Sequence, residues 1–387
     1  MTTFRFDRME AAGSLGNLGT LLPLAVGMIV LNGLSATSVF LLVGLFYILA
    51  GLYFQVPAAV EPMKAIGAYA VALGLTPLEI QASCLWMGGV LLLLGVSGLI
   101  EIIQRFTPKS AVRGVQLVVG VLLLTRGLEL MVEPDVHMQL QDVLGVPLGP
   151  LVGALGLIAT LLLLDNRRVP AAMVILIVGI GLGLLFGKPF EIGVPSRSSL
   201  LSVGPYGWPS PDVFWWVLPI LVLPQLPVTV GNAILSNVEL SRDYFREKSA
   251  RVTNRSVSIS MGLANCAAFV FGGMPMCHGA GGLAAHYRFG ARTAGSNVII
   301  GGLLVLLALG LGERLVRVLN LIPDAILGVL LVFAGIQLAL MIRDLADRRD
   351  LFVALLMLGL GLALNLAVAF LAGVAAAYLI RLRRIRV

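Results

Sequence analysis

The sequence predicts an all-α protein that crosses a membrane many times. Hydrophobic residues make up 58% of its 387 residues and charged residues only 12%, whereas soluble domains carry about 25% charged residues. Long, mainly apolar runs without charges recur along the chain, and about 20 such residues span a bilayer as a helix. The runs are continuous, whereas a transmembrane β-barrel would show short alternating strands. We therefore expect a polytopic protein embedded in the lipid bilayer.

We expect about fourteen membrane segments, two of them short and interrupted. Their approximate ranges are 13–33, 37–54, 57–74, 79–102, 112–131, 145–164, 169–187, 213–238, 252–272, 275–287, 295–313, 323–342, 350–365 and 367–380. Most basic residues fall in loops that are cytoplasmic if both termini are cytoplasmic, as the positive-inside rule requires. The distribution of the basic residues along the chain therefore indicates the orientation in the cell (inner) membrane. Because these residues sit in short loops between apolar runs, the net charge of +7 does not indicate nucleic-acid binding.

The two halves of the sequence resemble each other. LPLAVG at residues 22–27 resembles LPVTVG at residues 226–231, and two later matches follow in the same order: Val56–Pro57 with Met274–Pro275, and Ala68–Tyr69 with His286–Tyr287. Seven segments per half is an odd number, so the second copy would be inverted in the membrane. Inverted repeats with interrupted helices are the architecture of secondary transporters.

The two interrupted segments, residues 55–69 and 271–283, are the predicted substrate site. Their prolines remove a backbone donor and favour the first turn of a helix, and their glycines let a ligand approach the backbone. Both segments therefore predict extended backbone that leads into a helix N-terminus. Such backbone is tolerated at membrane depth only where it is buried in protein or lines a cavity. Two facing helix N-termini suit an anion.

Charge balance singles out three side chains. Two helix N-termini supply about +1 elementary charge, so a dianion requires another positive group or a co-transported proton. Lys64 is the candidate fixed charge and His278 the candidate titratable one. The alternatives are an i,i+3 ion pair of Lys64 with Glu61 and a neutral His278 that only bonds to backbone. Glu61 is a candidate proton carrier, because a carboxyl in a low-dielectric site tends to hold a proton.

Polar residues inside the apolar runs complete the candidate site. Gln225 lies between Pro224 and Pro227, and its amide could donate to oxyanion oxygens, although amides in membrane helices often only tie helices together. The predicted substrate-binding set is Asn17, Thr20, Pro57, Ala58, Ala59, Lys64, Gln225, Met276, Cys277, His278, Gly279 and Gly281, with Glu61 and His278 as candidates for ion coupling. The three cysteines, Cys84, Cys266 and Cys277, give no metal-ligand spacing, and we expect no metal and no cofactor.

These stretches resemble the molybdate transporter family, which is related to the sulfate permeases. VPAAVEPMKAIGAYAVALG at 56–74 and GGMPMCHGAGGLAAHYRFGAR at 272–292 look like its two signature stretches, and residues 16–27 and 223–245 also resemble family segments. The resemblance implies a seven-plus-seven inverted repeat in which a core domain moves against a gate domain, and a homodimer through the gate helices. Asn17 stands where the family pattern has Asp, and Glu61 where it has Gln, which bears on ion coupling.

The domain ranges that this resemblance implies are a first repeat over 1–200, with core 13–104 and gate 111–190, and a second over 205–387, with core 213–318 and gate 323–380. The expected function is secondary active transport of molybdate, and of sulfate or tungstate if the site accepts them, with a proton or sodium ion as the coupling ion. The alternatives are a permease of the same fold for a nucleobase or bicarbonate, and a passive anion channel. We expect no enzymatic activity, since the sequence contains no hydrolase motif and no Walker motif.

Overall fold

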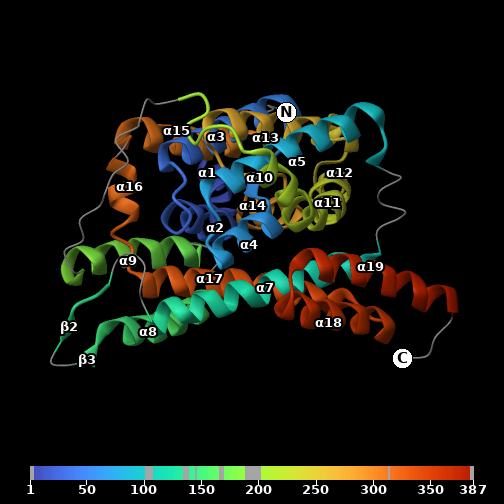
Figure 1. Cartoon of the computed structure of the whole chain (residues 1–387). Helices are drawn as coiled ribbons and strands as arrows, with labels where there is room; N and C mark the ends of the chain where they lie inside the picture. The colour runs from blue at the N-terminus through green and yellow to red at the C-terminus, as the bar shows by residue number, and fades with distance from the viewer. Residues whose placement is uncertain are drawn as a thin grey trace.

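The computed structural model describes residues 4–100, 108–133, 139–143, 146–164, 170–187, 202–312 and 314–383, and these residues are mostly helical. Figure 1 shows the helices in two layers. One layer is a thick bundle that contains α1–α5 and α10–α15. The other is flatter and contains α7–α9 and α17–α19, with α16 running between the layers at one side.

The first half of the chain is a series of helices with three very short strands. Its elements are α1 (Arg8–Ser14), α2 (Leu18–Val30), α3 (Ala36–Phe54), β1 (Glu61–Pro62), α4 (Lys64–Leu73), α5 (Pro77–Ser97), α7 (Lys109–Val132), β2 (Asp142–Val143), β3 (Val146–Pro147), α8 (Leu148–Leu163) and α9 (Ala171–Phe186). Strands β2 and β3 pair with each other, whereas β1 pairs with a strand of the second half.

The second half begins with one long helical run that changes its winding at several points. This run comprises α10 (Pro211–Val217), the π-helical η1 (Leu218–Val222), α11 (Leu223–Val228), the π-helical η2 (Thr229–Ser236), α12 (Asn237–Phe245) and the 3₁₀-helical η3 (Arg246–Ser249). The remaining elements are α13 (Asn254–Phe271), β4 (Met276–Cys277), α14 (Ala280–Phe289), α15 (Gly295–Leu311), α16 (Arg314–Leu319), α17 (Asp324–Ala339), η4 (Leu340–Asp344), α18 (Arg348–Ala363) and α19 (Leu366–Arg383).

Each of the fourteen predicted segments contains a helix, and α1 and α16 are short additional helices. Within the described ranges, five helical runs are long and apolar enough to span a membrane, or six if the bent pair α1–α2 forms one span. The others are shorter apolar helices. The helices are therefore those of a membrane protein, and the number of fourteen membrane crossings stays a prediction.

Local sequence signals determine where several helices begin and end. Thr76 and Glu79 form a capping box at the start of α5, where Pro77 occupies the first helical position. A second capping box, between Thr253 and Ser256, begins α13. The α13 helix ends at Gly272, whose φ of 71° lies in the left-handed region that glycine adopts without strain.

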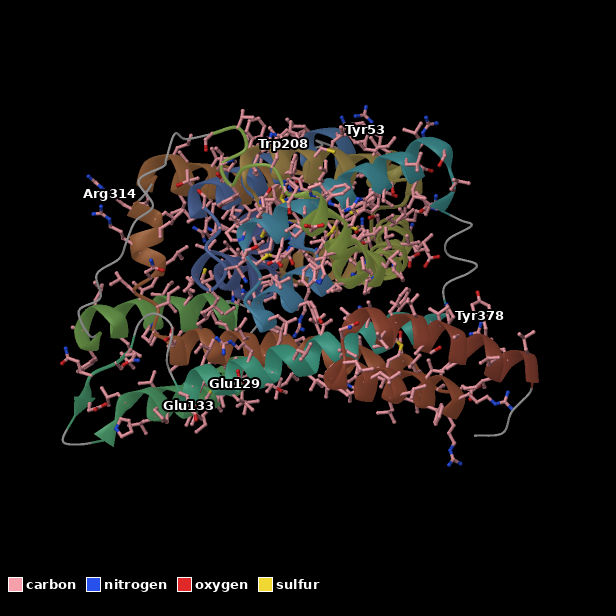
Figure 2. All side chains as sticks on the ribbon, viewed as in Figure 1. Tyr53, Glu129, Glu133, Trp208, Arg314 and Tyr378 are labelled. Atoms are coloured by element: carbon pink, nitrogen blue, oxygen red, sulfur yellow. The ribbon has the colours of Figure 1, made fainter. Side chains whose placement is uncertain are left out.

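Glycines bring the backbones of α7 and α17 into contact. A Cβ added to Gly127 of α7 would lie 2.6 Å from the carbonyl oxygen of Gly328 in α17, and one added to Gly120 would lie 2.6 Å from that of Gly335. Small residues at such crossings are the usual basis of helix packing in membranes, where apolar side chains gain little by leaving lipid. Figure 2 shows that side chains also fill the space inside the thick layer, while Arg314 projects from its side.

Enlarging a crossing glycine should therefore destabilise the flat layer. Gly127→Ala forces the backbones of α7 and α17 apart, and overpacking of this kind costs about 1–3 kcal/mol. Gly89→Ala in α5 is the matched control, because a Cβ at Gly89 would have no neighbour within 4 Å. Thermal unfolding of the detergent-purified variants checks this. Equal midpoints for the two variants would contradict the role assigned to Gly127.

Candidate functional site

Strands β1 and β4 bring the two interrupted segments together at the centre of the thick layer. They are antiparallel, with Glu61 opposite Cys277 and Pro62 opposite Met276, and Met63 N–H donates to the carbonyl oxygen of Pro275 at 2.9 Å. Directly after its strand, each segment enters a half-helix, α4 at Lys64 and α14 at Ala280. This is the extended backbone and helix start that the prolines and glycines predict.

Two asparagines hold the extended backbone in place. Asn297 of α15 accepts from the N–H of Ala58 at 3.0 Å and donates to the carbonyl oxygen of the same residue at 2.8 Å. Asn265 of α13 does the same to Met276, at 3.0 and 2.7 Å. Each amide takes the place of the backbone partner that a neighbouring strand would supply. This stabilises the extended backbone, because a peptide group without a hydrogen bond is costly away from water.

Gln225 of α11 occupies the N-terminus of α4. Its Oε1 accepts from the backbone N–H groups of Ala65 and Ile66, at 2.8 and 3.1 Å, and its Nε2 donates to Thr229 Oγ1 at 2.9 Å. Gln225 is therefore a side-chain cap for the half-helix. It satisfies two of the N–H groups that an α-helix leaves without partners at its start.

Lys64 and Glu61 form an ion pair at the start of α4. Lys64 Nζ lies 3.1 Å from Glu61 Oε2, with 16% of the lysine side chain exposed and the glutamate side chain fully buried. The i,i+3 pair considered from the sequence is thus present. Lys64 is also within reach of α14, since its Nζ lies 3.8 Å from the position of a Cβ on Gly281.

The carboxyl group of Glu61 lies against the first turn of α14. A Cβ on Gly279 would collide with both Glu61 oxygens, and a Cβ on Gly282 would collide with Glu61 Oε1 and with Asn17 Oδ1. The glycines are therefore required by the close approach of these side chains to the helix backbone. Because a helix N-terminus carries a partial positive charge, this is a favourable place for a carboxylate or another anion.

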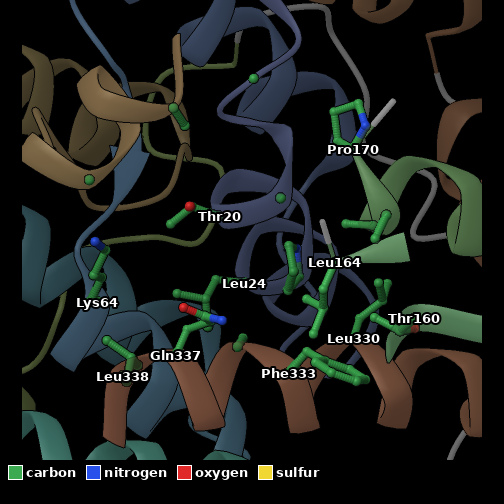
Figure 3. A pocket seen from close by; sticks show the side chains of 18 of the residues that line it. Thr20, Leu24, Lys64, Thr160, Leu164, Pro170, Leu330, Phe333, Gln337 and Leu338 are labelled. Atoms are coloured by element: carbon green, nitrogen blue, oxygen red, sulfur yellow. The ribbon is translucent and has the colours of Figure 1, made fainter. Parts of the chain in front are cut away.

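A cavity of about 390 Å³ extends from this point to the flat layer. Figure 3 shows Thr20, Leu24 and Lys64 at one side and Leu330, Phe333 and Gln337 of α17 at the other. Most of the lining is apolar, and its polar members are Thr20, Lys64, Gln116, Thr160, Asn232 and Gln337. Among the described residues that line the cavity, Lys64 is the one with a charged side chain.

Both ring nitrogens of His278 lie within hydrogen-bond distance of protein atoms. Its Nδ1 lies 2.7 Å from the carbonyl oxygen of Ala59 and its Nε2 lies 2.8 Å from Ser260 Oγ. The ring also packs against Phe46 and Phe54, with centroids 4.8 and 5.5 Å away. A carbonyl oxygen only accepts, so Nδ1 carries a proton. His278 therefore links one interrupted segment to the other through Ala59, and links its own segment to α13 through Ser260.

The structure divides the predicted binding set into three groups. Thr20, Lys64 and Gly281 line the cavity, and Asn17, Glu61 and Gly279 meet beside it at the start of α14. The remaining members are buried and lie outside the lining: Pro57, Ala58, Ala59, Gln225, Met276, Cys277 and His278. Among them, Gln225 and His278 form the side-chain hydrogen bonds described above. The sequence analysis did not identify Asn297, although an amide side chain inside an apolar helix was a signal that could have found it. It also did not identify Gln116 and Gln337, which only tertiary packing brings to the cavity.

Comparison with known proteins identifies the family. A family model described as "Molybdate transporter of MFS superfamily" matches residues 9–123 and 218–338. Molybdate transporter 1 of Arabidopsis thaliana is 31% identical over 96% of this chain and 87% of its own length, and molybdate transporter 2 of the same plant is 32% identical over 97% and 87%. Molybdate transporter 1 of Chlamydomonas reinhardtii is 29% identical over 94% and 89%.

Solved structures share the fold at low sequence identity. The transmembrane domain of a cyanobacterial bicarbonate transporter, BicA, aligns with a TM-score of 0.68 at 16% identity, over 96% of this chain and 97% of that domain. Murine Slc26a9, an anion transporter solved in the inward-facing state, aligns with a TM-score of 0.68 at 13% identity, over 99% of this chain and 70% of its own. On the matches to the family model and to the plant relatives, the chain belongs to the molybdate transporter family, a family of membrane transporters and not of enzymes.

Proposed function

We propose that this protein transports molybdate, and tetrahedral oxyanions of similar size and charge such as sulfate or tungstate, by alternating access. The observation that carries the proposal is the position of Lys64. It is the charged side chain of the cavity lining, and it lies where α4 and α14 both begin. The N-terminus of α14, with Gly281 facing the cavity, adds roughly half a positive charge. A tetrahedral oxyanion between Lys64 and Gly281 would meet both.

The helix contacts support a seven-plus-seven inverted repeat. Let α2–α9 form one copy and α10–α15 with α17–α19 the other. If each helix is replaced by its counterpart in the other copy, a helix contact observed in the structure becomes a second contact that is also observed. The packing of α3 on α15 becomes that of α13 on α5, and α8 on α17 becomes α18 on α7. The contact of α2 with α9 likewise becomes that of α11 with α19, and α7 on α17 maps onto itself. The family model also matches one range in each half.

The two layers supply the moving parts of the proposed mechanism. In this proposal the thick layer is the core domain and the flat layer is the gate domain (Figure 1). The cavity lies between them, lined by α2, α4 and α14 of the one and by α8, α9 and α17 of the other. Sliding or rocking of the thick layer against the flat one would expose the site first to one side of the membrane and then to the other.

The proposed orientation places both termini in the cytoplasm of the cell and the cavity mouth on the same side. The lining includes Gly16 near the start of α2, Phe289 at the end of α14 and Met341 after α17. These are helix ends for which the distribution of basic residues predicts a cytoplasmic position. The conformation would then be inward-open.

Removal of the Lys64 charge should weaken anion binding strongly. We expect Lys64→Met to raise the Kd for molybdate by more than tenfold, because Coulomb interactions in a low-dielectric cavity exceed the roughly 1 kcal/mol of an exposed pair. Binding of labelled molybdate to purified protein measures this. The double variant Lys64→Met, Glu61→Gln is the control. Recovery of binding in it would mean that Lys64 only neutralises Glu61.

Gly281 offers a steric test of the same position. A Cβ there meets only Lys64 Nζ, at 3.8 Å, so Gly281→Val should fold yet fill the space beside the α14 N-terminus. We expect uptake of molybdate into proteoliposomes to fall at least tenfold. Gly302→Val in α15 is the matched control, since a Cβ at Gly302 also has no close neighbour. Normal uptake by Gly281→Val would place the anion elsewhere, and competition by bicarbonate or uracil but not by sulfate or tungstate would overturn the substrate class.

Orientation can be measured separately. Cysteines introduced at the exposed Lys109 and Gln141 should react with a membrane-impermeant thiol reagent from opposite sides, Lys109→Cys from the cytoplasm and Gln141→Cys from outside. Labelling of both from the same side of intact cells would contradict the proposed topology.

A further inference from the structure

Two buried oxygen atoms that lack a hydrogen-bond donor lie beside each other at the start of α14. Asn17 Oδ1 and Glu61 Oε1 both approach Gly282 so closely that a Cβ there would collide with each. Within the described residues, neither oxygen has a hydrogen-bond partner. Asn17 is 1% exposed and Glu61 is fully buried. Buried acceptors left without a donor are costly, so this arrangement suits a group that supplies a hydrogen-bond donor between the two oxygens.

The orientation of the Asn17 amide is determined by its other contacts. Asn17 Nδ2 lies 3.0 Å from the carbonyl oxygen of Val60 and 2.8 Å from Tyr47 Oη. A carbonyl oxygen can only accept a hydrogen bond, so the nitrogen of the amide must be on this side. Oδ1 is thereby left to face α14 and Glu61. Rotating the amide would give the Glu61 carboxylate a donor but would place two carbonyl oxygens against each other at Val60.

We propose that Glu61 and Asn17 form the binding site of a transported proton, an inference that rests on the transport function proposed above. A proton on the carboxyl of Glu61 converts an acceptor oxygen into a donor, for which Asn17 Oδ1 is the fixed acceptor. A proton suits the site better than a sodium ion. A proton needs one oxygen to bond to and one acceptor, which Glu61 Oε1 and Asn17 Oδ1 supply, while Lys64 Nζ lies 3.1 Å from the other carboxyl oxygen.

Protonation of Glu61 changes the charge that the cavity presents to an anion. With Glu61 ionised, the Lys64–Glu61 pair is neutral. With Glu61 protonated, the pair carries +1, and Lys64 faces the cavity without its counter-ion. The proton comes from water in the open cavity, the O–H bond forms on the carboxyl, and the same bond breaks when the cavity opens to the other side, with no transfer of electrons. Proton and oxyanion therefore favour each other's binding, and by linkage the effect is reciprocal.

Among the described residues, four other titratable groups interact electrostatically with Glu61 from the elements packed around it. They are Lys64 of α4, Cys277 of β4, Tyr47 of α3 and His286 of α14. His286 is the one whose titration could imitate that of Glu61. Its Nδ1 lies 2.7 Å from the carbonyl oxygen of Gly13 and its Nε2 lies 3.4 Å from Tyr47 Oη, and Tyr47 Oη in turn lies 2.8 Å from Asn17 Nδ2. A His286→Gln variant separates the two.

The first experiment measures molybdate affinity against pH in purified protein, together with proton uptake on binding. If the protonated form binds the anion, affinity is greatest at low pH and falls as pH rises through the titration of Glu61, by up to about tenfold per pH unit for one linked proton. Wild type should take up about one proton per anion. Glu61→Gln, which resembles the protonated form, should bind at all pH values without proton uptake, and His286→Gln should keep the wild-type slope.

A second experiment needs no molybdate. The infrared carbonyl stretch of a protonated buried carboxyl should appear in wild type as pH falls and be absent in Glu61→Gln. Asn17→Leu, which removes the acceptor, should move this titration to lower pH. The double variant Asn17→Asp, Glu61→Gln places the carboxyl group at position 17 and the amide at position 61. It should restore the pH dependence of binding that Glu61→Gln alone lacks.

The outcomes distinguish this inference from the transport function. Binding of molybdate with an unchanged pH slope in Glu61→Gln, or with a dependence on sodium and no proton uptake, would overturn the proton site and leave the transport function in place. A carboxyl band that titrates as expected in a protein that binds no molybdate at any pH would overturn the transport function and leave the proton site in place.

Discussion

The site depends on one constraint: backbone that is neither helix nor sheet must find hydrogen-bond partners inside the protein when water is absent. Here the two interrupted segments pair with each other through β1 and β4. Asn297, Asn265 and Gln225 supply the remaining partners, for Ala58, for Met276 and for the first turn of α4 respectively. Because these contacts come from α11, α13 and α15, the position of the two half-helices is set by the whole thick layer and not by the segments themselves.

Once the backbone is held in this way, the electrostatics of the site are local. Gln225 occupies the N-terminus of α4, so the α14 N-terminus is the one that faces Glu61 and the cavity. Glu61 lies between that N-terminus and Lys64. A carboxylate in this place is already an anion held by the groups that would hold a substrate oxyanion. In the proposed mechanism, anion binding is therefore coupled to the charge of Glu61.

The sequence predicted the backbone of the site better than its side chains. Prolines and glycines in residues 55–69 and 271–283 indicated extended stretches before half-helices, and β1–α4 and β4–α14 have this form. The same stretches did not reveal what His278 and Gln225 contact. His278 bonds to Ala59 and Ser260, and Gln225 caps α4. A side chain beside a helix break can face either the ligand or the neighbouring backbone, and its partners lie far away in the chain.

By itself, the sequence determined the class of the protein, because apolar length and charge distribution depend on composition along the chain and not on contacts. It also determined where helices begin and end, through capping boxes such as Thr76 with Glu79 and the glycine at 272. Tertiary structure alone decided that Asn17 faces Glu61 across Gly282, and that Gln337 reaches the same cavity as Lys64. These residues are separated by tens to hundreds of positions. Their proximity follows from helix packing at glycine contacts, which no local pattern encodes.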